Sequence, residues 1–347
     1  MTLHEIKQRL QGHLSDGLVL VVGSGLSCAE GLPGMSELGS HLRSSVPPAL
    51  TGDDVAAWSS IDALIETKGL EAALLEQPPS QEIEARIVTE TGNLVLAREK
   101  AVIEQVFSGR TTLRITKLIK HLLKPNTGLP IITTNYDRLV EIGLEEAGVG
   151  VDTLFTGRFA GTINEQFSRY SFCTGIKAHS KTPSLTFRDR AMVYKPHGSL
   201  DWYLRNGKPV CYGGELGPDV ARLIITPGRN KFRTGYDSPF DVHRSRANDA
   251  IDKASRFLIL GYGFNDGHLE THLSPAIQQG KPTLMMTYEL TPKARAMALE
   301  FPSVIAMERS VQDSIEGTRI IVDRTETIVP EQSLWDVNHF IREVLGS

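Results

Sequence analysis

The sequence predicts an α/β fold, with a doubly wound, mostly parallel sheet and a helical insert. Three observations support this prediction. Short apolar runs alternate along the chain with segments of helical periodicity. Several of the apolar runs end directly in Gly, Ser, Asn or Asp before a helix begins. A stretch of about 85 residues after the first strand has helical patterning and no clear strand.

The expected strands are short, apolar and rich in β-branched residues, which is typical of strands buried on both faces of a sheet. They lie at residues 18–22, 129–134, 151–155, 192–195, 223–226, 257–261 and 283–287, with a strand or hairpin near 319–329. The expected helices have apolar residues three or four positions apart. Outside the insert they lie at residues 3–14, 138–148, 239–255, 291–300 and 334–345, and one more ends at 279. Residues 156–190 are expected to form a long loop or a small excursion.

The chain has 347 residues, which is more than one compact core usually holds. We expect an α/β domain of residues 1–37 and 126–310, a helical insert of residues 38–125, and a C-terminal strand or hairpin with a helix at residues 311–347. Apolar residues make up 40% of the chain and charged residues 22%, and the net charge is −4. This balance is typical of a globular protein that nucleic acid and anionic membranes do not strongly attract.

Three widely spaced cysteines exclude both a disulfide framework and a four-cysteine zinc site, so we expect no bound metal. The N-terminal segment mixes acidic and basic side chains and lacks the apolar core of a signal peptide. No run of about 18 apolar residues predicts a membrane span. The simplest expectation is a cytoplasmic protein that binds neither membranes nor nucleic acid directly.

The first strand ends in the turn Gly23-Ser24-Gly25, and a short helix-compatible segment follows. In a strand–turn–helix unit the backbone N–H groups and the helix dipole suit a pyrophosphate, and glycine lets a phosphate approach the backbone. The alternative is an ordinary tight turn. Cys28 stands where a dinucleotide fingerprint has its third small residue, and a helical pattern replaces the second strand with its terminal acidic residue. An ordinary dehydrogenase unit therefore fits poorly.

Four polar segments each follow an expected strand: GSGLS at 23–27, TTNYD at 133–137, KPHGS at 195–199 and GYGFND at 261–266. In doubly wound sheets ligands bind at the carboxyl ends of the strands. We therefore expect these four segments to line one crevice. Their meeting in one sheet is a stronger indication of a binding site than any one of them alone.

Several side chains in these segments have both a structural and a functional interpretation. His197 can take a proton from a hydroxyl group or from water, although a lone histidine is by default structural. Asn135 is either a helix N-cap or a group that orients a ribose or a water, and Asp137 is either a first-turn acid or its support. Asn265 and Asp266 are either caps of the following helix or contacts to an adenosine.

Together with GLPG at 31–34, these segments occur in the order of the sirtuin motifs, and the chain resembles that family over about residues 15–290. The resemblance implies a Rossmann-like sheet that binds NAD+ and cleaves its nicotinamide–ribose bond, with Asn135 and His197 as the chemical residues, and we expect Asp137 to support Asn135 in catalysis. It implies contacts to NAD+ from Gly23, Ser24, Gly25, Ser27, Pro33, Thr133, Thr134, Gly261, Tyr262, Gly263 and Asn265.

The chain departs from the deacylating sirtuins at several points. It lacks the four zinc-binding cysteines, Gly34-Met35 replaces a Phe-Arg pair, Thr134 replaces a glutamine, and GYGFND replaces a late Gly-Thr-Ser. These features resemble the sirtuin-like domains of bacterial anti-phage defence systems, which hydrolyse NAD+ to ADP-ribose and nicotinamide. The resemblance implies an NAD+ glycohydrolase that forms a homo-oligomer, alone or with a HerA-type ATPase or another defence protein, and whose activity assembly or the partner restrains.

Three other functions remain open at the level of the sequence. The first is an NAD-dependent deacylase or ADP-ribosyltransferase, which would need an acceptor besides water. The second is a module that senses NAD+ or ADP-ribose without turnover. The third is a dehydrogenase, against which the missing acidic residue counts.

Overall fold

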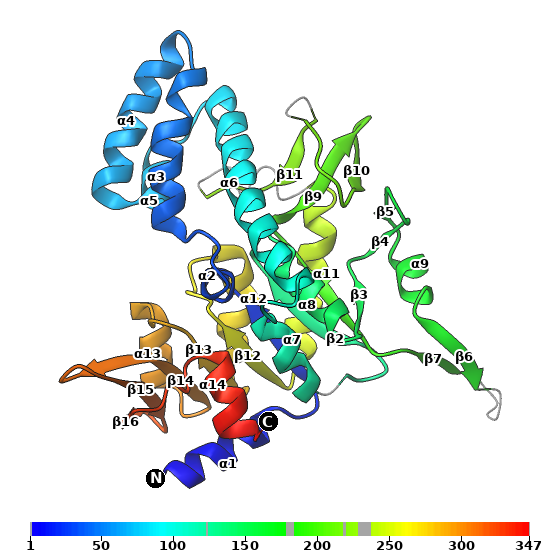
Figure 1. The fold of residues 1–347 in the computed structure, drawn as a ribbon, viewed down its shortest axis with the longest axis vertical. Helices are drawn as coiled ribbons and strands as arrows, with labels where there is room; N and C mark the ends of the chain where they lie inside the picture. The colour runs from blue at the N-terminus through cyan, green and yellow to red at the C-terminus, as the bar shows by residue number, and fades with distance from the viewer. Residues whose placement is uncertain (1, 123, 178–183, 218–219, 228–236, 347) are drawn as a thin grey trace.

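A nine-stranded sheet forms the centre of the protein in the computed structural model, which describes all residues except 1, 123, 178–183, 218–219, 228–236 and 347 (Figure 1). Its strands are β1 (Leu18–Val22), β2 (Leu129–Thr133), β3 (Gly150–Asp152), β8 (Arg190–Tyr194), β12 (Arg256–Leu260), β13 (Thr283–Met286), β14 (Val304–Gln312), β15 (Ile315–Val322) and β16 (Thr325–Pro330). Their order is β16-β15-β14-β13-β12-β1-β2-β8-β3. All neighbours from β14 to β3 are parallel, and only β15 and β16 are added antiparallel. The predicted α/β class, a mostly parallel sheet of Rossmann-like type, is confirmed.

The strand order reverses between β1 and β12 at the middle of the sheet. From β1 the chain continues to β2, β3 and β8 on one side, and later returns to β12, β13 and β14 on the other. Open α/β sheets bind ligands at the carboxyl ends of the strands beside such a switch point. The four polar segments follow β12, β1, β2 and β8, which are consecutive in the sheet.

Side chains of β1 alternate between two apolar cores, one on each face of the sheet. Leu18, Leu20 and Val22 belong to one core, and Val19 and Val21 to the other. The first core is covered by α1 (Leu3–His13), α7 (Arg114–Leu118), η2 (Ile119–His121), α8 (Leu139–Glu146), α14 (Val337–Phe340) and the π-helical turn η3 (Ile341–Leu345). The second is covered by α11 (Phe240–Lys253), α12 (Gly267–Gln278) and α13 (Pro292–Glu300).

Residues 38–122, all of which the structure describes, contain helices and loops but no strand, as the sequence predicts. The elements after the short helix α2 (Ser24–Ala29) are α3 (Met35–Ser45), η1 (Pro47–Ala49), α4 (Asp53–Lys68), α5 (Leu70–Glu76) and α6 (Gln81–Phe107). Helices α3 to α5 share an apolar core of their own with Ile83 and Ile87 of α6, and they project from the sheet in Figure 1. Val95, Val102 and Val106 of α6 instead belong to the core of the sheet, so α6 joins both cores.

Two parts of the chain differ from the elements that the sequence predicts. The expected strand 151–155 ends early, because Leu154 has a φ of +66° and breaks the extended backbone. The excursion after it contains β4 (Phe155–Thr156), β5 (Thr162–Ile163), α9 (Glu165–Tyr170), β6 (Cys173–Lys177) and β7 (Ser184–Phe187), with residues 178–183 outside the described residues. After β8 the chain forms a second small sheet of β9 (Gly198–Arg205), β10 (Lys208–Cys211) and β11 (Arg222–Ile224).

The C-terminal part also differs, because β14 was not predicted as a strand. It pairs in parallel with β13 and antiparallel with β15, so the expected hairpin near residues 319–329 extends the main sheet. The last helix, α14, starts at Val337, later than expected, and η3, which continues it, packs against α1 (Figure 1). Among the described residues, every helix is too short or too polar to cross a bilayer.

Candidate functional site

A cleft of about 400 Å³ opens at the carboxyl ends of β1, β2, β8 and β12. Most of the predicted site residues line it together: Ser24, Gly25, Ser27, Pro33, Thr134, Asn135, Asp137, His197, Gly261, Tyr262, Gly263 and Asn265. The other two, Gly23 and Thr133, are buried and contact Asn135. The structure therefore brings the four polar segments to one place.

The glycines of the first turn are required by the neighbouring turn after β12. A Cβ on Gly23 would lie 2.4 Å from the main-chain oxygen of Gly261, and one on Gly25 would lie 2.7 Å from the Gly261 Cα. Gly25 N donates to Gly261 O at 2.9 Å. Gly261 itself has a φ of +59°, which favours glycine. The two turns thus form one rigid floor of the cleft, a structural reason for these glycines besides room for a phosphate.

Asn135 joins the turn after β2 to the turn after β1. Its Nδ2 donates to Gly23 O at 2.9 Å and to Ser27 Oγ at 2.8 Å, and its own backbone N–H donates to Thr133 Oγ1 at 3.1 Å. The two hydrogen bonds from Nδ2 use both hydrogens of the side-chain amide. Oδ1 is therefore the side-chain atom left to accept a hydrogen bond from a ligand. The side chain is not a simple helix N-cap, and it is 7% exposed at the cleft wall.

Asp137 begins the turn into α8. Its Oδ1 accepts from Leu139 N at 3.2 Å, but Asp137 lies one residue ahead of the N-cap Arg138 and not in the first turn of the helix as expected. Burial raises the pKa of Asp137 above its ordinary value, while the Lys195 ammonium and a hydrogen bond from Ser27 oppose that rise. Asp137 therefore supports the start of α8 and also belongs to the polar network beneath Asn135.

Lys195 is a buried lysine that joins the turn after β2 to the turn after β8. Its Nζ donates to the main-chain oxygens of Tyr136, at 3.5 Å, and Asp137, and to Glu141 Oε1 at 2.9 Å. Burial alone would lower the pKa of Lys195, but the carboxylates of Glu141 and Asp137 raise it above its ordinary value. One buried cation therefore holds the backbone of the turn that carries Asn135 and lies two residues before His197.

We expect Lys195→Met to lower the free energy of unfolding by about 3 kcal/mol, because it leaves the buried Glu141 carboxylate without its partner. Two main-chain oxygens lose their donor as well. Denaturant unfolding followed by tryptophan fluorescence measures the loss.

The matched control for this variant is Lys68→Met. Lys68 pairs with Glu76 at 2.6 Å, but the two side chains are 49% and 51% exposed. An exposed pair contributes about 0–1 kcal/mol, so this substitution should have little effect. Equal losses in the two variants would contradict the role given to Lys195.

His197 lies in the turn between β8 and β9. A Cβ on Gly198, whose φ is +89°, would lie 2.2 Å from Leu223 O, so glycine is required beside the histidine. The main-chain oxygen of His197 accepts from Ile225 N at 2.9 Å. These contacts fix the backbone and hold the imidazole, with His197 9% exposed, at the wall of the cleft.

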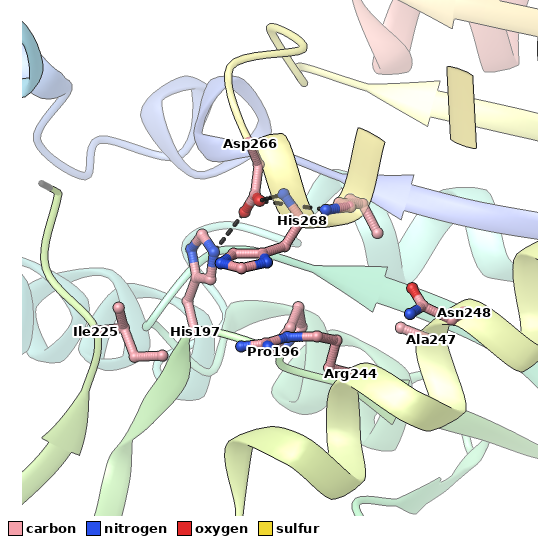
Figure 2. A pocket seen from close by; sticks show the side chains of 9 residues that line it. Pro196, His197, Ile225, Arg244, Ala247, Asn248, Asp266 and His268 are labelled. Atoms are coloured by element: carbon pink, nitrogen blue, oxygen red, sulfur yellow. Dashed lines mark hydrogen bonds and ion pairs between the residues drawn. The ribbon is translucent and has the colours of Figure 1, made fainter. Parts of the chain in front are cut away.

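Asp266 caps helix α12, which confirms one of its two predicted roles. Its Oδ1 accepts from the backbone N–H groups of His268, at 2.9 Å, and Leu269, at 3.2 Å. Figure 2 shows that its other oxygen, Oδ2, contacts Nε2 of His197, and both side chains are largely buried. No local pattern indicates this pair, because 69 positions separate the two residues.

Helices α3, α5 and α6 supply the wall of the cleft that faces the sheet. Their contribution consists of Met35, Leu38, Glu71 and Val95. Glu99, fully buried on α6, also accepts from the backbone N–H and the guanidinium of Arg138, next to the Asn135 turn. The helical region therefore both covers the cleft and holds one of its turns, a role that the helical pattern did not indicate.

A second cavity of about 420 Å³ adjoins the cleft and shares Gly25, Gly261 and Thr287 with it. Tyr288 and Trp335 line it and meet edge to face, with ring centroids 5.3 Å apart. The two cavities meet at the Gly25–Gly261 contact. Among the residues that the structure describes, no three His, Cys, Asp or Glu side chains are grouped as a metal site.

The sequence profile of the SIR2-like domain family matches residues 130–303, which is just over half of the chain. The chain therefore belongs to the SIR2-like domain family. The matched segment contains Asn135, Asp137, His197 and Asp266, whereas the Gly23–Ser27 turn lies outside it. No curated protein matches the chain.

Several solved structures resemble the fold at low sequence identity. A structure described as the structural basis of sirtuin substrate affinity is 15% identical, with 84% of this chain and 90% of that chain covered and a TM-score of 0.41. Sir2Tm bound to a propionylated peptide is 14% identical, with 84% and 89% covered and a TM-score of 0.41. A mutant Sir2 homologue in complex with ADP-ribose is 14% identical, with 83% and 87% covered and a TM-score of 0.41.

Proposed function

We propose that the protein hydrolyses the nicotinamide–ribose bond of NAD+ and releases nicotinamide and ADP-ribose. The observation that carries the proposal is that Asn135 and His197 line one cleft with the Gly23–Ser27 turn. Membership of the SIR2-like family relates the chain to NAD-dependent sirtuins. A cleft of about 400 Å³ lies within the usual range of ligand sites, about 300–1,000 Å³.

The side chains of the cleft fit the needs of this hydrolysis. Nicotinamide leaves with the electron pair of the broken C–N bond, and since the pyridinium is already cationic, the site needs little acid catalysis. Asn135 offers a fixed amide oxygen that can hold the attacking water or a ribose hydroxyl. His197 takes the proton of the water as its oxygen bonds to the ribose carbon. The helical wall limits the access of bulk water.

Two adjoining cavities could hold the two ends of a dinucleotide. In our proposal the pyrophosphate lies over the floor formed by the turns after β1 and β12, with the nicotinamide end toward Asn135. The adenosine end lies toward the adjoining cavity, where the rings of Tyr288 and Trp335 offer apolar contact. Gly263 and Asn265 line the cleft beside this floor.

We further propose that hydrolysis depletes cytoplasmic NAD+ during defence against phage. This part rests on the resemblance of the motifs to the sirtuin-like domains of such systems. Because unrestrained hydrolysis of NAD+ would harm the host, control through a homo-oligomer or through a partner such as a HerA-type ATPase is part of the proposal.

The test is a chromatographic assay of nicotinamide and ADP-ribose from NAD+ and the full chain in its native assembly, whose mass is measured on the same sample. We expect equal amounts of both products without any acceptor. Release that depends on an acetyl-lysine peptide would instead show a deacylase or transferase. Binding of NAD+ without nicotinamide release would show a sensing module, and hydride transfer to or from the cofactor would show a dehydrogenase.

A further inference from the structure

The pair of His197 and Asp266 fixes which imidazole nitrogen carries a proton in the neutral ring. Asp266 is 5% exposed, and its Oδ2 contacts Nε2 of the histidine (Figure 2). An ionised carboxylate only accepts hydrogen bonds, so Nε2 must carry a proton. In the neutral ring Nδ1 then keeps its lone pair. Of the hydrogen bonds that the structure describes, none uses Nδ1 of His197, so Nδ1 is the nitrogen left to take a proton.

The carboxylate cannot turn away from this contact, because the cap of α12 holds it. Its Oδ1 receives two backbone N–H groups, at 2.9 and 3.2 Å, which leaves Oδ2 for the imidazole. Capping needs only one oxygen, and Asn or Ser would supply it as well as Asp. The second oxygen is therefore what distinguishes aspartate from the other good caps at this position.

Other titratable groups surround the histidine from each packed element. They are Arg244 of α11, His268 of α12, Tyr136 and Asp137 after β2, and Tyr262 after β12, with Lys195 on its own segment. Of the hydrogen bonds and ion pairs to the His197 imidazole that the structure describes, the one to Asp266 is the direct contact. The other groups form the polar and aromatic surroundings.

We propose that Asp266 is a positioning residue that sets the tautomer of His197 and so makes Nδ1 the base. The choice of reaction rests on the proposed function, but the tautomer does not. In the hydrolysis, Nδ1 takes a proton from water while the water oxygen bonds to the ribose carbon and nicotinamide leaves with the electron pair of the C–N bond. Asp266 keeps the Nε2 proton and stabilises the imidazolium that forms.

The decisive variant is Asp266→Asn. Its amide oxygen can still cap α12, but an N–H donor now faces Nε2 and favours a proton on Nδ1 instead. We expect kcat for nicotinamide release to fall about 100-fold, with KM and the thermal midpoint little changed. Asp266→Ser also keeps an N-cap for α12 and should lose activity as well. It tests whether the loss in Asp266→Asn comes from a folding defect specific to asparagine.

The tautomer is measured without any substrate by nitrogen-15 NMR of the imidazoles, at an alkaline pH above which the imidazole shifts no longer change. We expect a proton on Nε2 and none on Nδ1 in the wild type, and the reverse in Asp266→Asn. A wild-type proton on Nδ1, or an unchanged pattern in the variant, would overturn the proposal. If the wild type instead shows this tautomer but releases no nicotinamide, only the proposed function fails.

The chain offers a matched control on its surface. His272 Nδ1 and Asp252 Oδ1 lie 2.9 Å apart, with side chains 36% and 57% exposed. Asp252→Asn removes the same carboxylate charge from a histidine pair, and we expect no change in kcat. A loss equal to that of Asp266→Asn would show a general effect of charge and refute the positioning role.

Discussion

Replacement of Asn135 by alanine should reduce nicotinamide release by at least about 1,000-fold while the protein still folds. The amide is the only side chain in our proposal with an oxygen fixed toward the cleft by two hydrogen bonds from its own nitrogen, at 2.9 and 2.8 Å. Without the amide the attacking water loses its hydrogen-bond acceptor. The turn that contains Gly23 and Ser27 also loses its two hydrogen bonds from the turn after β2. The measurement is product release at saturating NAD+, with circular dichroism and thermal unfolding as checks of the fold.

Two further variants serve as controls for the Asn135→Ala result. Asn135→Asp is isosteric but places a carboxylate oxygen against Gly23 O, so it should also be inactive. Asn164→Ala removes a different asparagine, the N-cap of α9, at a cost of about 1 kcal/mol in stability. It should keep full activity. Near wild-type turnover in Asn135→Ala would contradict the assignment of this residue.

Replacement of His197 by alanine should lower kcat by about 1,000- to 10,000-fold, the upper range for loss of a general base. The fold should survive, because Asp266 keeps its cap of α12 and Gly198 keeps the turn. KM should change far less than kcat, since the ring acts on the water and not on the binding of NAD+. Steady-state kinetics of nicotinamide release separate the two constants.

The control for this variant is His272→Ala, which removes an exposed histidine that is also paired with an aspartate. It should leave both constants unchanged. Turnover of His197→Ala within a few-fold of wild type would show that another group takes the proton. In that case the geometry of the cleft would support binding without the base that we propose.

The sequence predicted the position of the cleft because its signals are local. Apolar β-branched runs mark strands buried on both faces, and the polar segments after them mark the carboxyl ends where parallel strands meet. Those two facts predict that Asn135 and His197 lie in one crevice. The division into three domains stays a prediction, because β14 crosses residue 310 and α6 belongs to two cores.

The sequence was a weaker guide where an element mixes polar and apolar residues or depends on a distant partner. Strand β14 carries Glu308, Arg309 and Gln312 among its apolar residues, and it forms because β13 and β15 supply its hydrogen bonds. The strand expected at 151–155 ended early for a different reason, the positive φ of Leu154. Local composition gave no sign of either outcome.

By itself, then, the sequence determined the fold class, the helical character of residues 38–122 and the four strand ends that form the cleft, since hydrophobic periodicity and turn residues act over short distances. Only the tertiary structure decided how these ends are connected. Three contacts depend on which strands and helices become neighbours. They are the contact of Asp266 with His197, that of the buried Lys195 with Glu141, and the salt bridge of Glu99 with Arg138. Such contacts join residues far apart in the chain, and a buried charge such as that of Lys195 needs its fixed partner because burial alone disfavours the charged form.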